Sequence, residues 1–377
     1  MREEVAGDSL LEEARAVSVQ LAAAEAERED NRYQGMPSDA DSREVFEGLG
    51  RANLIGLHWP EALGGRGLDP LRTLAAEEVF GYHWLAMSSY LLSVKTIGNA
   101  LMRFAAPALV ERLLPQIASG ELIFCQGFSE PDAGSDLAAV RTKAFFDGDR
   151  YIVSGRKMWT SSAERADWIY LAVRTDPDVP RHRGLSVLVA EMRSPGIEVR
   201  THLTLGGGTL GEVVLDDVVV SADQIVGERH GGWPVLMGTM DFERITSEKV
   251  GVALWLLDSL RPLADTPAER TAVRRLYGEV HAARLHGHRA TELLAAGRPA
   301  SAASSMAKLS VAKLMQQLAA FAVNLLGPAA LIEQSPAALF DGRVAAFHRA
   351  AVATTIAGGA SDIQRSVIAR HRFGATT

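Results

Sequence analysis

The hydrophobic period of this chain changes twice along its length. From residue 9 to about residue 120, apolar residues recur at helical spacing; in SLLEEARAVSVQLAAAEAERED (9–30), for example, Leu10, Ala14 and Leu21 share one face. Short strand-like runs separated by turn residues then follow, and helical periodicity returns after residue 230. This order predicts an α+β multidomain fold with an N-terminal α-helical domain (1–120), a middle antiparallel β domain (121–229) and a C-terminal four-helix-bundle-like α domain (230–377).

The middle region has a clear hairpin signal. RTKAFFDGDRYIVSG contains two strand-like runs that meet at Asp147-Gly148, a dipeptide that favours tight β-turns. DWIYLAVRT, LSVLVAEM, IEVRTHL and GEVVLDDVVV follow at short spacing, and no long helical pattern interrupts them. An antiparallel sheet or a small barrel is therefore expected.

Composition excludes several classes of protein. The chain has 377 residues and a formal net charge of -7, which argues against a nucleic-acid partner because phosphate contacts need a basic face. Its single cysteine, Cys125, cannot form an intramolecular disulfide and fits a reducing compartment. The acidic N-terminus has no signal-peptide core, and no window approaches roughly 18 uninterrupted apolar residues. These features predict a cytoplasmic protein with no membrane span.

Two weak motifs favour ordinary structure over a ligand site. GGGTLG (206–211) leads into a strand, whereas a dinucleotide-binding loop should leave a strand and open a helix, so a plain turn is expected. The histidines of HAARLHGH are five and two residues apart and do not share one helical face, so no metal site is predicted.

Residues 127–176 contain two segments whose side chains could bind a ligand. Ser129, Gly134 and Ser135 form a loop of small and hydroxylic residues at a strand end, and Trp159-Thr160-Ser161 form a second loop one hairpin later. Such loops can present N–H and hydroxyl groups to a polar ring while a tryptophan covers it. On the residues alone, a surface turn beside a core tryptophan remains the simpler interpretation.

The same segment resembles the acyl-CoA dehydrogenase family. SEPDAGSD is similar to the family's S/T-E-P-x-A-G-S-D signature, and GRKMWTSS is similar to its G-x-K-x-W/F-I/T-S/T motif. The resemblance covers nearly the whole chain and implies the acyl-CoA dehydrogenase fold. It also implies FAD between the middle sheet and the C-terminal bundle, and α,β-desaturation of an acyl thioester.

Position by position, the resemblance implies site roles for matched residues. Trp159 would cover the flavin ring, Thr160-Ser161 would reach its N5 side, and Ser135 would touch the pantetheine or phosphate part of the substrate. The full set of implied cofactor-binding residues is Gln126, Phe128, Ser129, Gly134, Ser135, Trp159, Thr160, Ser161, Ser361 and Asp362.

The family's usual catalytic base is missing from this chain. IAGGASDIQRSVIAR resembles I-Y-E-G-T-S-E-I-Q-R-x-x-I-A-R, and the family's glutamate falls on Gly358. The reaction needs a carboxylate because it removes a weakly acidic α-proton. Members resembling isovaleryl- and long-chain acyl-CoA dehydrogenases instead carry the base on the first long helix of the C-terminal domain, directly before an arginine.

GTMDFERITSEKVG places Glu243 before Arg244, and this carboxylate is the predicted general base. Taken alone, Glu243 would be read as a solvated helix residue, and its pairing with Gly358 changes that interpretation. The N–H of Gly358 would polarise the thioester carbonyl. The implied substrate-binding residues are Ser135, Asp241, Arg244, Gly358, Gly359 and Arg370.

The chain departs from the family where a neighbouring subunit normally holds the adenine half of FAD. The interval LLDSLRPLADTPAERTAVRRLYGEV has no R-x-x-F-G and is shorter than in the family, and Pro262 and Pro267 should break its helix. A motif like Q-x-x-G-G reads NLLGP, and GTSE reads GASD. These changes favour a heteromeric assembly with a paralogous subunit, resembling α2β2 enzymes of bacterial steroid side-chain degradation. A homo-oligomer is the alternative.

Three functions remain in competition. The first is FAD-dependent dehydrogenation of an acyl thioester, carried by CoA or by a carrier protein, with transfer to an electron acceptor. The second is a flavin-dependent oxidase or monooxygenase on the same fold. The third is a non-catalytic subunit of a heteromeric dehydrogenase. Glu243 at the alternative base position favours the first.

Overall fold

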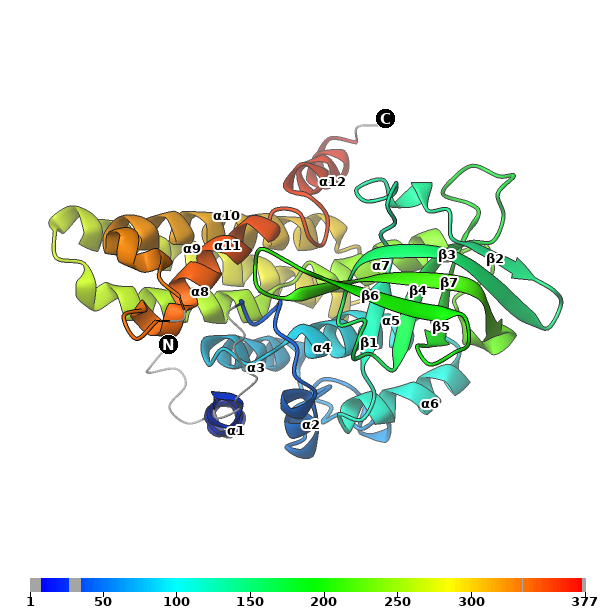
Figure 1. Cartoon of the computed structure of the whole chain (residues 1–377), viewed down its shortest axis with the longest axis horizontal. Coiled ribbons are helices and arrows are strands. Elements are labelled where there is room, and N and C mark those ends of the chain that lie inside the picture. Colours follow the sequence, from blue (N-terminus) through cyan, green and yellow to red (C-terminus); the bar gives the residue numbers. More distant parts are fainter. Residues whose placement is uncertain (1–7, 27–34, 334, 375–377) are drawn as a thin grey trace.

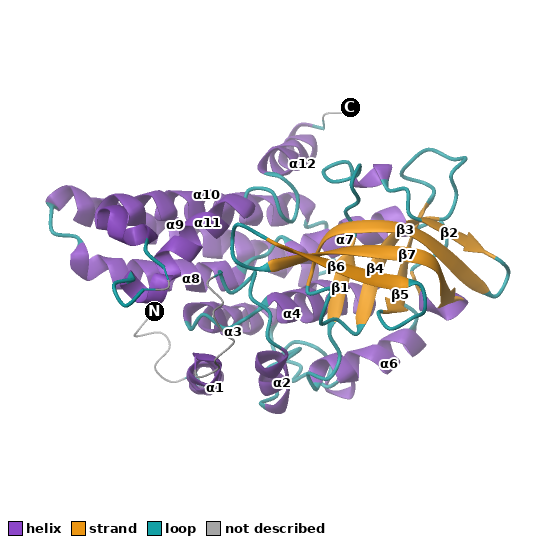
Figure 2. Ribbon diagram, in the orientation of Figure 1, coloured by secondary structure: helices purple, strands orange, loops and turns teal. Residues whose placement is uncertain are grey.

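A computed structural model describes residues 8–26, 35–333 and 335–374 (Figure 1). A sheet lies at one end of the molecule, a bundle of long helices lies at the other, and shorter N-terminal helices run beneath both (Figure 2). The predicted order of a helical domain, a β domain and a second helical domain is therefore confirmed. The end of the first predicted helical stretch, at 27–30, lies outside the described residues.

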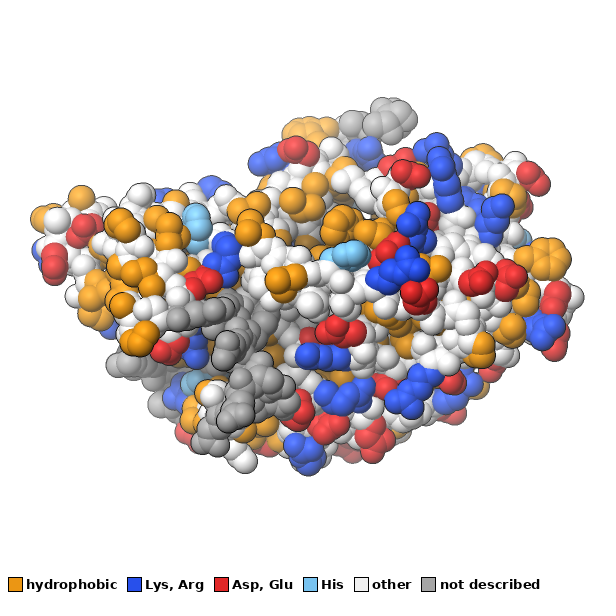
Figure 3. All heavy atoms as spheres, in the orientation of Figure 1, with side chains coloured by type: hydrophobic (Ala, Val, Ile, Leu, Met, Phe, Trp, Pro, Cys, Tyr) orange, Lys and Arg blue, Asp and Glu red, His pale blue; other side chains and the backbone are white. Residues whose placement is uncertain are grey.

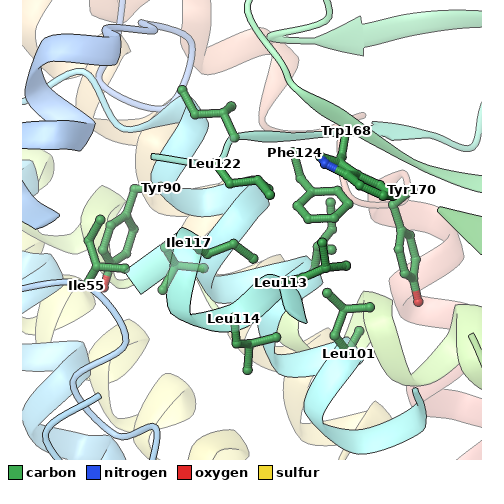
Figure 4. Packing of buried hydrophobic residues seen from close by; sticks show 14 of the residues in the cluster. Ile55, Tyr90, Leu101, Leu113, Leu114, Ile117, Leu122, Phe124, Trp168 and Tyr170 are labelled. Atoms are coloured by element: carbon green, nitrogen blue, oxygen red, sulfur yellow. The ribbon is translucent and has the colours of Figure 1, made fainter. Parts of the chain in front are cut away.

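The N-terminal domain is built from short helices with strong start signals. Asp69 caps α3 by accepting the N–H of Leu71, and Pro70 occupies its first turn. Figure 4 shows side chains of these helices packed against the sheet, with Leu113 beside Phe124. The elements are α1 (Ser9–Ala26), α2 (Arg43–Arg51), η1 (Glu61–Leu63), α3 (Pro70–Tyr82), α4 (Ser88–Tyr90), the π-helix η2 (Leu91–Gly98), α5 (Asn99–Phe104) and α6 (Pro107–Ala118).

Within the described residues, the middle domain is an eight-stranded sheet in the order β6-β7-β3-β2-β4-β5-β8, with β1 paired to β4. Most pairings are antiparallel, as predicted, but β1 and β2 each run parallel to β4, and the path is open rather than closed into a barrel. Strand β1 enters directly from the helical domain, so no hairpin sets its direction. The strands are β1 (Phe124–Gly127), β2 (Lys143–Phe146), β3 (Arg150–Ser161), β4 (Trp168–Arg174), β5 (Leu185–Glu191), β6 (Ile197–Leu203), β7 (Thr209–Ser221) and β8 (Ile225–Val226), with η3 (Leu137–Ala139) and η4 (Ala222–Gln224) between them.

Two predicted turns are confirmed. The Asp147 carboxylate accepts the N–H groups of Asp149 and Arg150, which closes the hairpin between β2 and β3. Of the predicted turn at 206–211, the glycines at 206–208 form the turn between β6 and β7, where the Thr204 N–H donates to the Gly208 carbonyl at 2.8 Å. Residues 209–211 already belong to β7.

The C-terminal domain is helical, and prolines interrupt it where the sequence predicts. Helix α8 ends before Pro262, and α9 begins at Pro267 behind a capping box formed by Thr266 and Glu269. The elements are α7 (Gly232–Glu243), α8 (Ser247–Leu260), η5 (Arg261–Leu263), α9 (Pro267–Ala295), α10 (Ser301–Leu326), η6 (Gly327–Leu331), η7 (Leu339–Gly342), α11 (Arg343–Ala353) and α12 (Ser361–Phe373).

Helix α10 and its continuation, Ser301–Leu331, are long and apolar enough by length and composition to cross a membrane. In the structure α10 packs against α8, α9, α11 and α12, and Lys308 and Lys313 interrupt its apolar sequence. This packing is that of a central helix in a bundle, which accounts for the apolar composition.

Two glycines bring the N-terminal and C-terminal domains into contact. A Cβ on Gly81 of α3 would lie 1.9 Å from the carbonyl oxygen of Glu248, and a Cβ on Gly251 of α8 would lie 1.9 Å from that of Glu78. No side chain fits at either position, so the backbones of α3 and α8 meet directly.

A buried ion pair joins the two motifs of the middle domain. The Lys157 ammonium lies 2.8 Å from a Glu130 carboxylate oxygen and also donates to the carbonyls of Ala172 and Phe128. The N–H and hydroxyl groups of Thr142 donate to the same carboxylate. Burial lowers the pKa of Lys157 to about 8, against the opposing effect of Glu130, so the lysine stays charged at pH 7.

Replacing Lys157 with methionine should destabilise the middle domain by about 3–5 kcal/mol, because it leaves the Glu130 carboxylate buried without its cation. Urea unfolding followed by tryptophan fluorescence would measure the change. The matched control is Arg289→Met, which removes an exposed ion pair with Glu292 and should leave the midpoint nearly unchanged. A loss for Lys157→Met no larger than that of the control would contradict this account.

Candidate active site

The segments SEPDAGSD and GRKMWTSS meet at the end of β1. The Ser129 carbonyl accepts the Met158 N–H at 2.9 Å, which brings the loop after β1 against β3. Trp159-Thr160-Ser161 is not the separate loop predicted from the sequence, because Thr160 and Ser161 pair with β7 and remain part of β3. A register shift between Lys157 and Thr160 gives Trp159 a left-handed backbone (φ 60°), and its side chain is 61% exposed.

Buried polar atoms beside this bulge have no protein partner among the described residues. They are the Thr160 hydroxyl oxygen and the Gln126 side-chain oxygen. Phe128 is buried and Ser129 half-buried between them in the chain. Buried hydrogen-bonding groups are normally satisfied, so this cluster has the character of a ligand surface.

Glu243 is the last residue of α7, and its carboxylate faces the end of β1. Gln126 Nε2 donates to Glu243 Oε2 at 3.1 Å, although 117 positions separate the two residues in the chain. A Cβ built on Gly358 would lie 3.3 Å from Glu243 Oε1. The structure therefore brings together Glu243 and Gly358, the two positions that the sequence analysis paired.

The glycine loop that precedes α12 is held by two side chains that sequence reasoning missed as site residues. Gln364 Nε2 donates to the carbonyls of both Gly358 and Gly359, and Lys308 Nζ donates to the Gly359 carbonyl at 2.8 Å. Burial, reinforced by Lys249, lowers the pKa of Lys308 to about 8. A lysine within the apolar sequence of α10 was the available signal for Lys308.

Gly358 has a φ of +66° and Gly359 a φ of +93°, which is the left-handed region that favours glycine. Within the described part of the chain, the Gly358 N–H donates to no protein acceptor. This donor lies beside the Glu243 carboxylate and remains available to a ligand.

Asp241 and Arg244 flank the base and are both buried. Arg244 Nη1 donates to Asp241 Oδ1 at 3.1 Å, and the Ser301 hydroxyl donates to Asp241 Oδ2 at 2.7 Å. Burial raises the pKa of Asp241, although Ser301 and Arg244 oppose the shift. The Arg244 Nε has no partner among the described residues, so the pair retains one buried donor.

The remaining predicted site residues lie further from Glu243. Gly134 and Ser135 are exposed in the loop after β1. Ser361 and Asp362 begin α12, and Arg370 is exposed in its last turn. In the described part of the chain, no hydrogen bond or ion pair joins these residues to Glu243.

A large open cavity of about 1460 Å³ lies elsewhere. Its walls include the loop at 37–44, the turn at 83–86, Gly207 and Gly208, and none of the predicted site residues. The predicted site residues that the structure brings together therefore lie around Glu243, outside this cavity.

Comparison with known proteins agrees with the order of the three domains. Three family models match consecutive parts of the chain: the acyl-CoA dehydrogenase N-terminal domain at 8–121, the middle domain at 125–218 and the C-terminal domain at 230–373. Among solved structures, the ChsE4-ChsE5 complex from Mycobacterium tuberculosis has a chain that is 28% identical with a TM-score of 0.81. That match covers 98% of this chain and 97% of the other.

Curated relatives are more similar in sequence. The acyl-CoA dehydrogenase IpdE1 of Mycobacterium tuberculosis is 33% identical over 86% of this chain and 86% of its own length. FadE26 of the same organism, also an acyl-CoA dehydrogenase, is 31% identical over 88% of this chain and 87% of its own. The chain therefore belongs to the acyl-CoA dehydrogenase family, a family of oxidoreductases that act on CH–CH groups.

Proposed function

We propose that this chain catalyses α,β-desaturation of an acyl thioester, with Glu243 as the general base. The observation that carries the proposal is the position of the Glu243 carboxylate between the Gln126 amide and the Gly358 backbone. A carboxylate held in this way keeps its other oxygen, Oε1, on the side of the glycine loop. The proposal covers an acyl group attached to CoA or to a carrier protein, since both present the same pantetheine arm.

The residues present fit an FAD cofactor, which the family implies. The unpartnered Thr160 hydroxyl suits the polar edge of a flavin, and the backbone of the segment Gln126 to Ser129 is proposed to face that edge. The exposed Trp159 indole offers a flat apolar surface to the flavin ring. Phe128, Ser129, Gly134, Ser135, Ser161, Ser361 and Asp362 complete the proposed cofactor-binding set. FAD, when bound, supplies the acceptor for the hydride that leaves the β-carbon of the substrate.

The chain's own residues then perform the proton chemistry. Glu243 takes the α-proton, so that a C–H bond breaks, an O–H bond forms and the electron pair stays on carbon. The Gly358 N–H donates to the thioester carbonyl, where negative charge develops as the proton leaves. Asp241, Arg244, Gly359 and Arg370 are proposed contacts on the substrate side.

Glu243→Gln should lower kcat by about 10²–10⁴-fold, because the amide cannot accept the α-proton. Steady-state turnover of a panel of saturated acyl-CoAs with an artificial electron acceptor would measure the loss. Glu292→Gln, on the exposed face of α9, is the control and should behave as wild type. Unchanged turnover of the flavin-loaded assembly that contains Glu243→Gln would support the non-catalytic-subunit alternative instead.

Gly358→Ala should lower kcat by about 10- to 100-fold, because its Cβ would press on a Glu243 oxygen and move the carboxylate away from the substrate. The positive φ at this position should also cost about 1 kcal/mol of stability. The control is Gly278→Ala, where a Cβ meets nothing within 4 Å. Wild-type kcat in Gly358→Ala would show that the carboxylate does not need this space.

We also propose that the chain works beside a second subunit, with a paralogue preferred over a second copy. Helix α12 projects from the body of the molecule, and Gln364 is its one fully buried residue (Figure 1). Hydrophobic side chains line the hollow beneath it (Figure 3), and Ile356 and Phe373 are exposed. The interval after α8 lacks the R-x-x-F-G that would hold FAD of a neighbouring subunit.

The chain expressed alone should contain little FAD, and co-expression with a neighbouring paralogue should restore it. Visible absorbance after gel filtration would measure flavin per chain and the size of the assembly. Near-stoichiometric FAD on a homo-oligomer would contradict the preference for a paralogous partner. It would leave the proposed chemistry of Glu243 intact.

A further inference from the structure

Gln126 has a side-chain geometry that its predicted role in binding flavin does not use. It is half-buried on β1, and its amide nitrogen donates to Glu243 Oε2 at 3.1 Å. Its amide oxygen is buried and has no partner among the described residues. The side chain therefore contacts the proposed base with one end and keeps an unused acceptor at the other.

The two ends of an amide suit the two states of a carboxyl group. An ionised carboxylate only accepts hydrogen bonds, so it pairs with Nε2. Once the carboxyl has taken a proton it becomes a donor and needs an acceptor, which Oε1 provides after a half-turn of the terminal amide. The half-turn exchanges Oε1 and Nε2 and requires no movement of the backbone.

The surroundings of Glu243 leave this task to Gln126. The other carboxylate oxygen, Oε1, faces Gly358, where the absence of a side chain leaves space and no side-chain acceptor for a proton. Arg244 is occupied with Asp241 through Nη1, and Lys308 Nζ donates to the Gly359 carbonyl. In the described part of the chain, Gln126 is the residue whose side chain hydrogen-bonds Glu243.

We propose that Gln126 is a positioning residue that holds the Glu243 carboxylate toward the substrate and hydrogen-bonds it in both protonation states. This inference rests on the proposed function of Glu243 and adds a role for a side chain on another domain. Strand β1 and the residues after it would then have two roles: the Gln126 side chain positions Glu243, and the backbone of Gln126 to Ser129 faces the flavin. The role requires a donor toward the ionised Glu243 and an acceptor toward the protonated one; methionine offers neither, and an ionised glutamate offers acceptors only.

The test compares Gln126→Met and Gln126→Glu with wild type in flavin-loaded enzyme. Wash-in of deuterium at the α-carbon reports proton transfer alone when it is measured in D₂O without an electron acceptor, on each saturated acyl-CoA of the same panel. Both variants should lose about 10- to 100-fold in exchange rate and in kcat, with KM and flavin content within twofold of wild type. Gln116→Leu, an exposed glutamine bonded to the Arg112 carbonyl, is the control and should change none of these values.

Either variant exchanging at the wild-type rate would overturn the proposal, as would a loss confined to KM or to flavin content. Absence of exchange in wild type would instead count against the proposed function. A crystal structure of Gln126→Met then decides the positioning role by itself. A Glu243 carboxylate displaced from its place beside Gly358 supports the role, and an unmoved carboxylate overturns it.

Discussion

The buried pair of Lys157 and Glu130 is the contact on which the geometry of the middle domain depends. A lysine with no exposed surface is costly to bury, and here the Glu130 carboxylate and two backbone carbonyls satisfy it. Glu130 lies in the loop after β1 and Lys157 lies on β3 just before the bulge at Trp159. The pair therefore fixes the distance between the loop after β1 and strand β3, which are 27 positions apart in the chain at Glu130 and Lys157. It explains in physical terms why the S-E-P and G-x-K motifs occur together.

The candidate site is assembled from three separate elements. Gln126 comes from β1, Glu243 from the end of α7, and Gly358 from the loop before α12. Helix α7 packs against both the π-helix η2 and strand β5, so the base is carried by an element that contacts the other two domains. Its position is consequently sensitive to how all three domains pack. The direct backbone contact of α3 with α8 at Gly81 and Gly251 reduces the freedom of that packing.

The sequence predicted features that depend on local pattern or on matched motifs. Asp147-Gly148 makes a hairpin, Pro267 begins a helix, and Glu243 lies beside Gly358. It did not predict the hydrogen bond of Gln126 to Glu243, because no local periodicity relates residues separated by 117 positions.

Lys308 was missed for a similar reason, since a cation in an apolar helix does not reveal which carbonyl it will reach. Trp159 was placed in a loop because the sequence cannot show that β7 continues to pair with Thr160 and Ser161. The roles of the individual site residues remain predictions.

The geometry at Gly358 gives a physical reason for the alternative base position. A side chain grown from residue 358 would start 3.3 Å from the Glu243 carboxylate oxygen, so the two positions address the same small volume. Two carboxylates there would repel each other and raise the pKa of one of them, which would remove a base at neutral pH. One carboxylate with a glycine opposite avoids that repulsion and leaves the backbone N–H accessible. A glutamate at 243 therefore requires a residue without a bulky side chain at 358. The identities of residues 243 and 358 depend on each other, because both side chains would occupy the same space.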